Sequence, residues 1–331
     1  MASITAGEFK GLRSWVLEGE AIRVVVLPDL GTKMASLVHR RTGRELLYQR
    51  DDWPVLRRPP YGASFGDYDL SGFDEMFPTI DVCHYAGGVW DGTRLPDHGE
   101  VWAVPWQCRV EGEALVASVH GWRLPYRLEK RVYLAGAAAV RLDYTATNLA
   151  GEDLNVLWAA HPLCACTAAT RIVLPPGTTT VVNTFGGSQR FAGYGARADW
   201  PEMTTRAGER SRLDRIGPPS LRRAEKYWVD GPVAAGWAAL HHTDTGEALG
   251  FAWPSDTVPY LGVWVTEGGY GGHYHAALEP ATAAMDRPDV ARQWGRGWTL
   301  PAYGSISWYL TLAIGQVASV SAVTPAGEVV A

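Results

Sequence analysis

Three polar residues lie beside apolar stretches of the chain, and their side chains can transfer protons. His98 lies in the motif PDHGEVW, His161 in the motif WAAHPL, and Glu279 in the motif ALEPAT. Each of them follows or opens a strand-like segment, so a β-scaffold can bring all three to one rim although they are far apart in sequence. Two imidazoles and a carboxylate form an acid and base set that can move protons on and off a substrate without a metal.

The order of these motifs resembles that of the aldose 1-epimerase (galactose mutarotase-like) family. There, a His-Gly pair after a proline-bearing turn, a later His-Pro and a late Leu-Glu-Pro mark the sugar site, and the resemblance runs from about Gly72 to Gly315. It implies that Glu279 is the base on the anomeric hydroxyl and that His161 protonates the ring oxygen. It also implies that His98 binds the substrate near the anomeric centre, and that the reaction uses no metal, nucleotide or redox cofactor.

The neighbours of the two catalytic candidates give these roles a physical basis. Pro162 lacks a backbone donor and directly follows His161, so we expect the strand to end there. Glu279 follows the apolar pair Ala277-Leu278 and precedes a proline. Burial in such a setting raises the pKa of a carboxyl group and makes it a better base near neutral pH.

The surroundings of His98 indicate an orienting role. Gly99 lets the backbone approach a ligand closely, and either Asp97 or Glu100 could fix the tautomer of the imidazole. Trp102 follows on the same predicted strand. Its indole could stack on a sugar ring or fill the core, and we include it among the substrate-binding candidates.

An acidic pair departs from the pattern of the family. Related hexose and hexose-phosphate epimerases usually carry an Arg in the loop that corresponds to residues 72–78, whereas this chain has Asp74 and Glu75 there. Two carboxylates repel a phosphate and suit the vicinal hydroxyls of a neutral sugar. The sequence therefore predicts a free aldose or a close derivative, bound in part by these two residues.

The family's substrate-binding Asp corresponds to a position near residues 224–228. Either Glu225 or Lys226 could occupy that position, and the sequence leaves both open. If Lys226 faces the site, an anionic sugar becomes an alternative substrate.

A rival motif lies next to Glu279. His273, His275 and Glu279 reproduce the His-x-His-x3-Glu spacing of a cupin metal site. A cupin needs one more His downstream, and none follows His275. This metalloenzyme reading is therefore the weaker alternative, and we expect His275 to line the sugar site beside the Gly-rich loop 268–272.

Composition excludes several classes of partner. The formal net charge is -5 and 20% of the residues are charged, which leaves no basic stripe for nucleic acid. The N-terminal sequence has no apolar signal region, and no apolar run approaches membrane-spanning length. The four cysteines lie in apolar runs, as buried free thiols do in a reducing compartment. We therefore expect a soluble cytoplasmic protein with a small-molecule partner.

Alternation of apolar and polar residues with a period of two dominates the chain. Residues 126–134 and 140–147 flank a Gly-containing link and predict a hairpin, and residues 305–314 predict another long strand. Further strands are expected at 21–27, 34–40, 99–109, 114–120, 153–160, 226–230, 234–241, 247–253 and 260–266.

Helical periodicity is confined to short pieces at 199–207 and 288–294, and residues 185–224 are expected to cross the surface near the site. Many strands with almost no helix between them predict antiparallel sheets. We expect residues 1–331 to form one large β-sandwich domain, which is also the fold that the resemblance implies.

The combined prediction is a mutarotase that interconverts the anomers of an aldose by ring opening. The alternative from a different class is a non-catalytic sugar-binding sandwich, in which Glu279 and His161 only hydrogen-bond the ligand.

Overall fold

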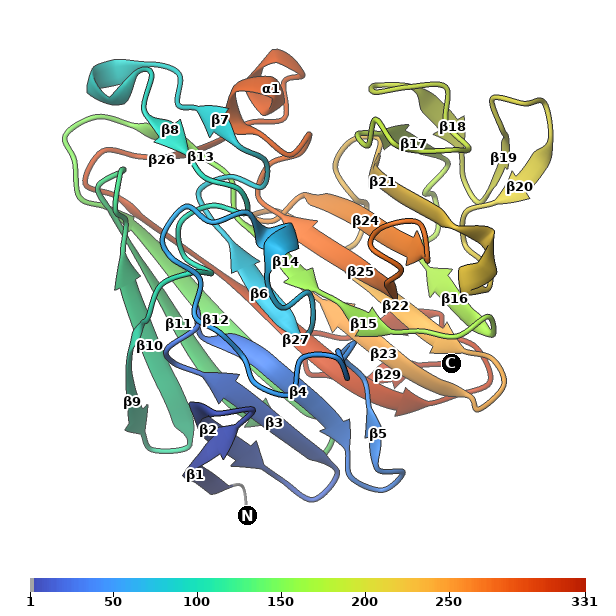
Figure 1. The fold of residues 1–331 in the computed structure, drawn as a ribbon, viewed down its shortest axis with the longest axis horizontal. Coiled ribbons are helices and arrows are strands. Elements are labelled where there is room, and N and C mark those ends of the chain that lie inside the picture. Colours follow the sequence, from blue (N-terminus) through green and yellow to red (C-terminus); the bar gives the residue numbers. More distant parts are fainter. Residues whose placement is uncertain (1–2) are drawn as a thin grey trace.

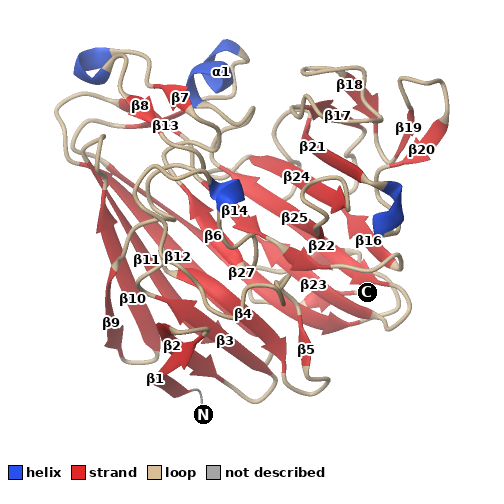
Figure 2. Cartoon of the chain, in the orientation of Figure 1, coloured by secondary structure: helices blue, strands red, loops and turns tan. Residues whose placement is uncertain are grey.

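The computed structural model describes residues 3–331, and antiparallel strands dominate it (Figures 1 and 2). Thirteen strands form one large sheet: β1 (Ser3–Phe9), β2 (Leu12–Glu18), β3 (Ile22–Leu27), β4 (Lys33–His39), β5 (Arg44–Glu45), β6 (Phe73–Met76), β14 (Ala159–Pro162), β15 (Cys164–Ala165), β17 (Thr180–Asn183), β18 (Arg197–Asp199), β21 (Arg223–Val229), β24 (Tyr260–Glu267) and β25 (Tyr274–Ala281).

Eight strands form the second sheet: β9 (Gln107–Glu111), β10 (Ala114–His120), β11 (Tyr126–Ala135), β12 (Ala139–Asn148), β16 (Thr170–Val173), β22 (Trp237–His242), β23 (Glu247–Ala252) and β27 (Ser305–Gln316). Four small two-stranded sheets complete the strands: β7 (Cys83–His84) with β8 (Arg94–Leu95), β13 (Leu154–Val156) with β26 (Trp298–Leu300), β19 (Glu202–Thr204) with β20 (Arg210–Arg212), and β28 (Ala322–Val323) with β29 (Val329–Val330).

Helical segments are short and lie outside the sheets. They are α1 (Pro288–Gln293) and the 3₁₀ turns η1 (Phe65–Asp67), η2 (Gly88–Trp90) and η3 (Pro219–Leu221). No helix within residues 3–331 is both long and apolar enough to cross a membrane. The predicted mainly-β fold with large antiparallel sheets is confirmed.

The core lies between the two large sheets and follows from the alternation of the strands. Leu128 of β11 and Leu142 of β12 are fully buried there, in the predicted hairpin, which pairs over its whole length. From the other sheet, Val263 of β24 and Leu278 of β25 enter the same core. Because strand side chains alternate, the residues between them point away from this core, and the site described below combines some of those residues with residues from loops.

The structure corrects three predicted elements. The single strand predicted at 153–160 is divided into β13 and β14, which belong to different sheets. In the predicted 99–109 segment only β9 forms a strand, and residues 99–106 are irregular. Gly99 takes a left-handed φ of 75°, which is not extended backbone. Trp106 donates its backbone N–H to the carbonyl of Pro28 and not to a neighbouring strand of a sheet. The predicted helix at 199–207 is replaced by the ends of β18 and by β19, where burial alternates with a period of two. The helix predicted at 288–294 is present as α1.

Candidate active site

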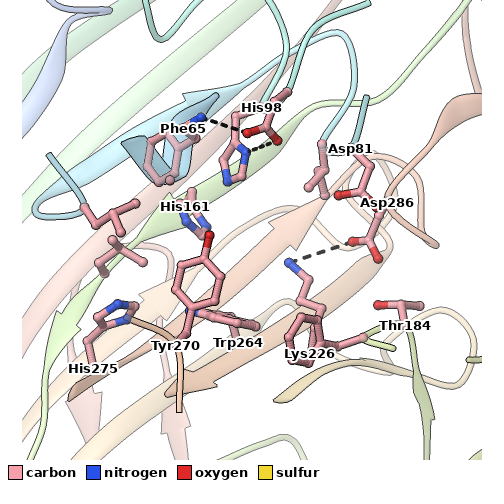
Figure 3. Close-up of a pocket in the computed structure, with 16 residues that line it drawn as sticks. Phe65, Asp81, His98, His161, Thr184, Lys226, Trp264, Tyr270, His275 and Asp286 are labelled. Atoms are coloured by element: carbon pink, nitrogen blue, oxygen red, sulfur yellow. Dashed lines mark hydrogen bonds and ion pairs between the residues drawn. The ribbon is translucent and has the colours of Figure 1, made fainter. Parts of the chain in front are cut away.

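A cavity of about 220 Å³ opens on the face of the large sheet that points away from the core (Figure 3). Its volume lies below the usual range of ~300–1,000 Å³ for drug-sized ligands, which suits a single sugar ring. Aromatic side chains form much of its wall, namely those of Phe65, Phe185, Trp264 and Tyr270. Its ionisable lining residues are Asp81, Asp97, His98, His161, Lys226, His275 and Asp286.

Three neighbouring parts of the sheet supply the central side chains. His161 comes from β14, Lys226 from β21 and His275 from β25, and all three lie on the cavity face. On β25, the core residues Ala276 and Leu278 alternate with His275 and Glu279. The period of two puts these side chains on one face of the sheet, and the pairing of β14 with β25 brings together His161 and His275, which are more than 100 positions apart in sequence.

Glu279 lies beneath the cavity and does not border it. Its side chain is fully buried, and both carboxylate oxygens are occupied: Oε1 contacts Nδ1 of His161 at 2.9 Å, and Oε2 accepts a hydrogen bond from Nζ of Lys226. Burial raises the pKa of Glu279, but the Lys226 ammonium and the His161 hydrogen bond outweigh it and hold the pKa at about 2. The prediction of a raised pKa was therefore wrong, because the sequence did not show the adjacent cation.

Gly262 makes room for this arrangement. It pairs with both Glu279 of β25 and Trp228 of β21 in the ladders of β24. A Cβ atom at Gly262 would come within 3.2 Å of the Glu279 carboxylate and 3.3 Å of the Trp228 ring. Without a side chain at this position, Lys226 can reach across β24 to Glu279.

His161 is neutral at physiological pH. Burial lowers its pKa to about 4 and outweighs the opposite effect of Glu279. Because an ionised Glu279 can only accept, the proton of their hydrogen bond belongs to Nδ1 of His161, and Nε2 carries a lone pair. Among residues 3–331, no group hydrogen-bonds Nε2, so this nitrogen is free to accept a proton from a ligand.

Lys226 carries the positive charge of the cavity. Burial lowers its pKa, but Glu279 and Asp286 outweigh that effect and raise the pKa above its ordinary value. Its Nζ lies 3.8 Å from Oδ1 of Asp286 as well as next to Glu279. Of the two residues that the sequence left open, Lys226 faces the cavity.

His98 is held by its neighbours on the cavity rim. Its Nδ1 lies 2.9 Å from Oδ1 of Asp97, and its ring stacks on Phe65 with 4.1 Å between the centroids. Asp97, and not Glu100, therefore fixes its orientation. Gly99 packs against the backbone of Phe77, where a Cβ would lie 2.2 Å from the carbonyl oxygen, so its close approach is to the protein and not to a ligand.

Asp74 and Glu75 do not line the cavity, which corrects their predicted placement. Alternation in β6 points them to opposite faces of the sheet. Asp74 is buried and accepts a hydrogen bond from Lys33 at 2.5 Å. Glu75 lies in the core, where Lys130 Nζ, at 3.0 Å, and the side chains of a tyrosine and a tryptophan donate to it.

Glu225 and Trp102 also lie outside the cavity lining. Glu225 points to the face opposite Lys226, and both its oxygens accept hydrogen bonds from Nε of Arg190 at 2.8 Å. Trp102 is buried behind the rim, where its indole N–H donates to the carbonyl of Asp97 at 2.9 Å. Both side chains therefore hold neighbouring protein segments in place.

The cupin motif does not assemble a metal site. His275 lines the cavity, whereas Nδ1 of His273 lies 3.1 Å from the hydroxyl of Tyr48, outside the lining. Glu279 is occupied by His161 and Lys226. Within residues 3–331, no group of three or more His, Cys, Asp or Glu side chains has the geometry to hold a metal ion.

Several lining residues were not predicted, chiefly Asp81, Thr184, Trp264, Tyr270 and Asp286. Asp286 reaches the cavity from a turn in which Met285 and Asp286 adopt left-handed φ values of 74° and 66°. Neither residue is a glycine, so the sequence gives no sign of this backbone conformation. Asp81 lies just beyond the loop in which the acidic pair was expected. The Gly-rich loop that was predicted beside the site contributes Tyr270, and the 185–224 segment contributes Phe185.

Comparison by sequence matches no protein-family model and no curated protein. Comparison by structure matches solved proteins over nearly the whole chain. The Slr1438 protein from Synechocystis is 14% identical with a TM-score of 0.68, covering 94% of this chain and 99% of that one. A galactose mutarotase-like protein from Clostridium acetobutylicum is 12% identical with a TM-score of 0.62, covering 96% and 99%. Galactose 1-epimerase from Lactobacillus acidophilus is likewise 12% identical with a TM-score of 0.62, covering 96% and 99%. The chain therefore has the galactose mutarotase-like fold.

Proposed function

We propose that the protein interconverts the anomers of an aldose or a close aldose derivative by opening and reclosing the sugar ring. The observation that carries this proposal is the hydrogen bond between His161 and the buried, ionised Glu279 at the wall of a cavity of monosaccharide size. A neutral imidazole whose Nδ1 is held by a carboxylate presents a basic Nε2, which is the arrangement that general-base catalysis requires.

In the proposed reaction, Nε2 of His161 takes the proton of the anomeric hydroxyl. The C1–O bond of the ring breaks as the C1 carbonyl forms, and the ring oxygen takes a proton from a donor on the other side of the ring. Lys226, the cation that lines the cavity, is the proposed donor. Rotation about C1–C2 and reclosure with the roles reversed give the other anomer.

Glu279 acts through His161 in this proposal and does not meet the sugar itself. Both its oxygens are occupied, and it lies beneath the lining of the cavity. Its negative charge stabilises the imidazolium that forms when His161 accepts a proton. This assignment differs from the roles that the resemblance implies: the base is His161 instead of Glu279, the proton donor is Lys226 instead of His161, and Glu279 supports the base.

The test is exchange NMR on equilibrated aldoses with and without the protein. A panel of neutral, amino and acidic sugars is screened for anomer exchange above the spontaneous rate, with His161→Gln as the matched control. We expect acceleration for at least one sugar and its loss in the variant. Saturable binding of sugars without acceleration of any of them would instead support the non-catalytic sugar-binding alternative.

A further inference from the structure

Two carboxylates lie on the same wall of the cavity, beside Lys226 and Thr184 (Figure 3). They belong to Asp81 and Asp286, and their segments are tied together because the backbone N–H of Asp81 donates to the carbonyl of Asp286 at 2.9 Å. The left-handed backbone at Met285 and Asp286 costs on the order of 1–3 kcal/mol per residue in general, and such conformations are concentrated at functional sites.

The negative charges of Asp81 and Asp286 are not fully neutralised by cationic side chains nearby. Lys226, the cation nearest to it, already pairs with Glu279 and lies 3.8 Å from Asp286. Among residues 3–331, no Lys, Arg or His side chain forms an ion pair with Asp81. Burial, together with the charge of Asp81, raises the pKa of Asp286 to about 6 in spite of Lys226, as expected where two carboxylates repel each other.

A third polar group on this wall is the hydroxyl of Thr184, whereas Oδ1 of Asp286 already accepts a hydrogen bond from the indole N–H of Trp228 at 3.2 Å. The hydroxyl of Thr184 is buried, with the residue 8% exposed, and it makes no well-formed hydrogen bond within the described residues, although it lies close enough to Asp286 to lower the pKa of that carboxyl group. Thr184 lines the cavity beside Asp286 (Figure 3). Buried polar groups are almost always satisfied, so an orphaned hydroxyl that lines a cavity points to a ligand atom.

We propose that this wall is a subsite for an ammonium group and that the substrate is therefore an amino sugar. An ammonium group has three hydrogens to donate, and Asp81, Asp286 and Thr184 offer three acceptors on one wall. The cation would also relieve the repulsion between the carboxylates, whereas a phosphate or a carboxylate on the sugar would add to it. This inference rests on the proposed function for the chemistry at C1, but its binding test does not.

The experiment measures binding by calorimetry, with free hexosamines that carry the amine at different ring positions. Each is compared with its N-acetyl derivative, which lacks the charge, and with its parent hexose. We expect at least one free amine to bind at least tenfold more tightly than both neutral counterparts. Equal or tighter binding of the neutral forms for every amine would overturn the proposal.

Two variants and a control test whether the preference for the amine depends on Asp81 and Asp286. Asp81→Asn and Asp286→Asn should each reduce the preference for the amine at least fivefold, whereas Asp244→Asn should not change it. Asp244 is exposed in the turn after β22 and lies outside the cavity lining. If the Asn variants do not fold, the proposal is tested by measuring how the affinity of the wild type depends on salt. The affinity for the amine should fall as ionic strength rises, and the affinity for the parent hexose should not.

The two proposals fail in different ways. Tight binding of an amino sugar without anomer exchange would leave the subsite standing and reject the mutarotase function. Exchange of a neutral sugar with no preference for any amine would support the function and reject the subsite.

Discussion

Glu279 and His161 lie on the paired strands β25 and β14, and Oε1 of Glu279 is 2.9 Å from Nδ1 of His161. The carboxylate is fully buried and ionised, while the imidazole borders the cavity and is neutral. This relationship fixes the tautomer of the histidine and aligns its remaining lone pair for proton transfer. It is the basis of the predictions that follow.

Glu279→Gln should reduce the rate of anomer exchange by ~10²–10⁴-fold, because the amide cannot stabilise the imidazolium form of His161. Exchange NMR on the substrate found in the screen measures this effect. Glu267→Gln is the matched control, since Glu267 is a buried carboxylate on β24 that binds Arg223 at 2.6 Å outside the cavity. Equal activity losses in the two variants would contradict a specific role for Glu279.

The dependence of stability on pH should show the neutral state of His161. Its pKa is about 4 in the folded protein against 6.5 for an ordinary histidine, so the unfolded chain binds the proton first as pH falls. Stability from this group is therefore present above about pH 6.5 and is lost as pH falls toward about 4. The Tm of His161→Gln should depend less steeply on pH over this window than that of the wild type. Parallel Tm curves would show that His161 is not buried in its neutral form.

Glu75→Gln should destabilise the fold without affecting the chemistry. Glu75 accepts hydrogen bonds from Lys130, Tyr144 and Trp158 in the core, and breaking one member of a buried ion pair typically costs about 3–5 kcal/mol. Urea unfolding measures the loss, and exchange NMR on the folded fraction should give the wild-type rate. A loss of activity at unchanged stability would instead indicate that Glu75 contacts the substrate.

A free hexose should be a better substrate than its 6-phosphate by at least tenfold in kcat/KM. Asp81 and Asp286 line the cavity, and like charges about 4 Å apart repel by roughly 1–4 kcal/mol between water-like and surface-like dielectrics. Exchange NMR with both sugars at matched ionic strength checks this expectation. Turnover of the phosphate at an equal or higher rate would show that Lys226 binds anions in spite of its carboxylate partners.

The sequence sufficed for the parts of the fold and site that follow from periodicity and short motifs. Alternation along residues 126–147 predicted the hairpin of β11 and β12, and the motifs around His98 and His161 predicted residues that do line the cavity. Their substrate contacts remain predictions.

The rest depends on contacts between distant segments. The carboxylate of Asp74 is bound by Lys33, which lies 41 positions before it in the sequence, whereas Asp81 lines the cavity. The low pKa of Glu279 depends on Lys226 reaching across β24, and no local pattern shows that contact. Alternation alone could have warned that the adjacent Asp74 and Glu75 point to opposite faces of one strand.

Nitrogen-15 NMR of the imidazoles tests the central claim most directly, because it reports which nitrogen of His161 carries the proton. With His161→Gln used for assignment, the account predicts a neutral ring at physiological pH, protonated at Nδ1 and unprotonated at Nε2, which takes a second proton only near pH 4. In Glu279→Gln this preference for the Nδ1-protonated tautomer should weaken. A ring that is protonated at Nε2, or an imidazolium at neutral pH, would contradict the assignment of His161 as the base.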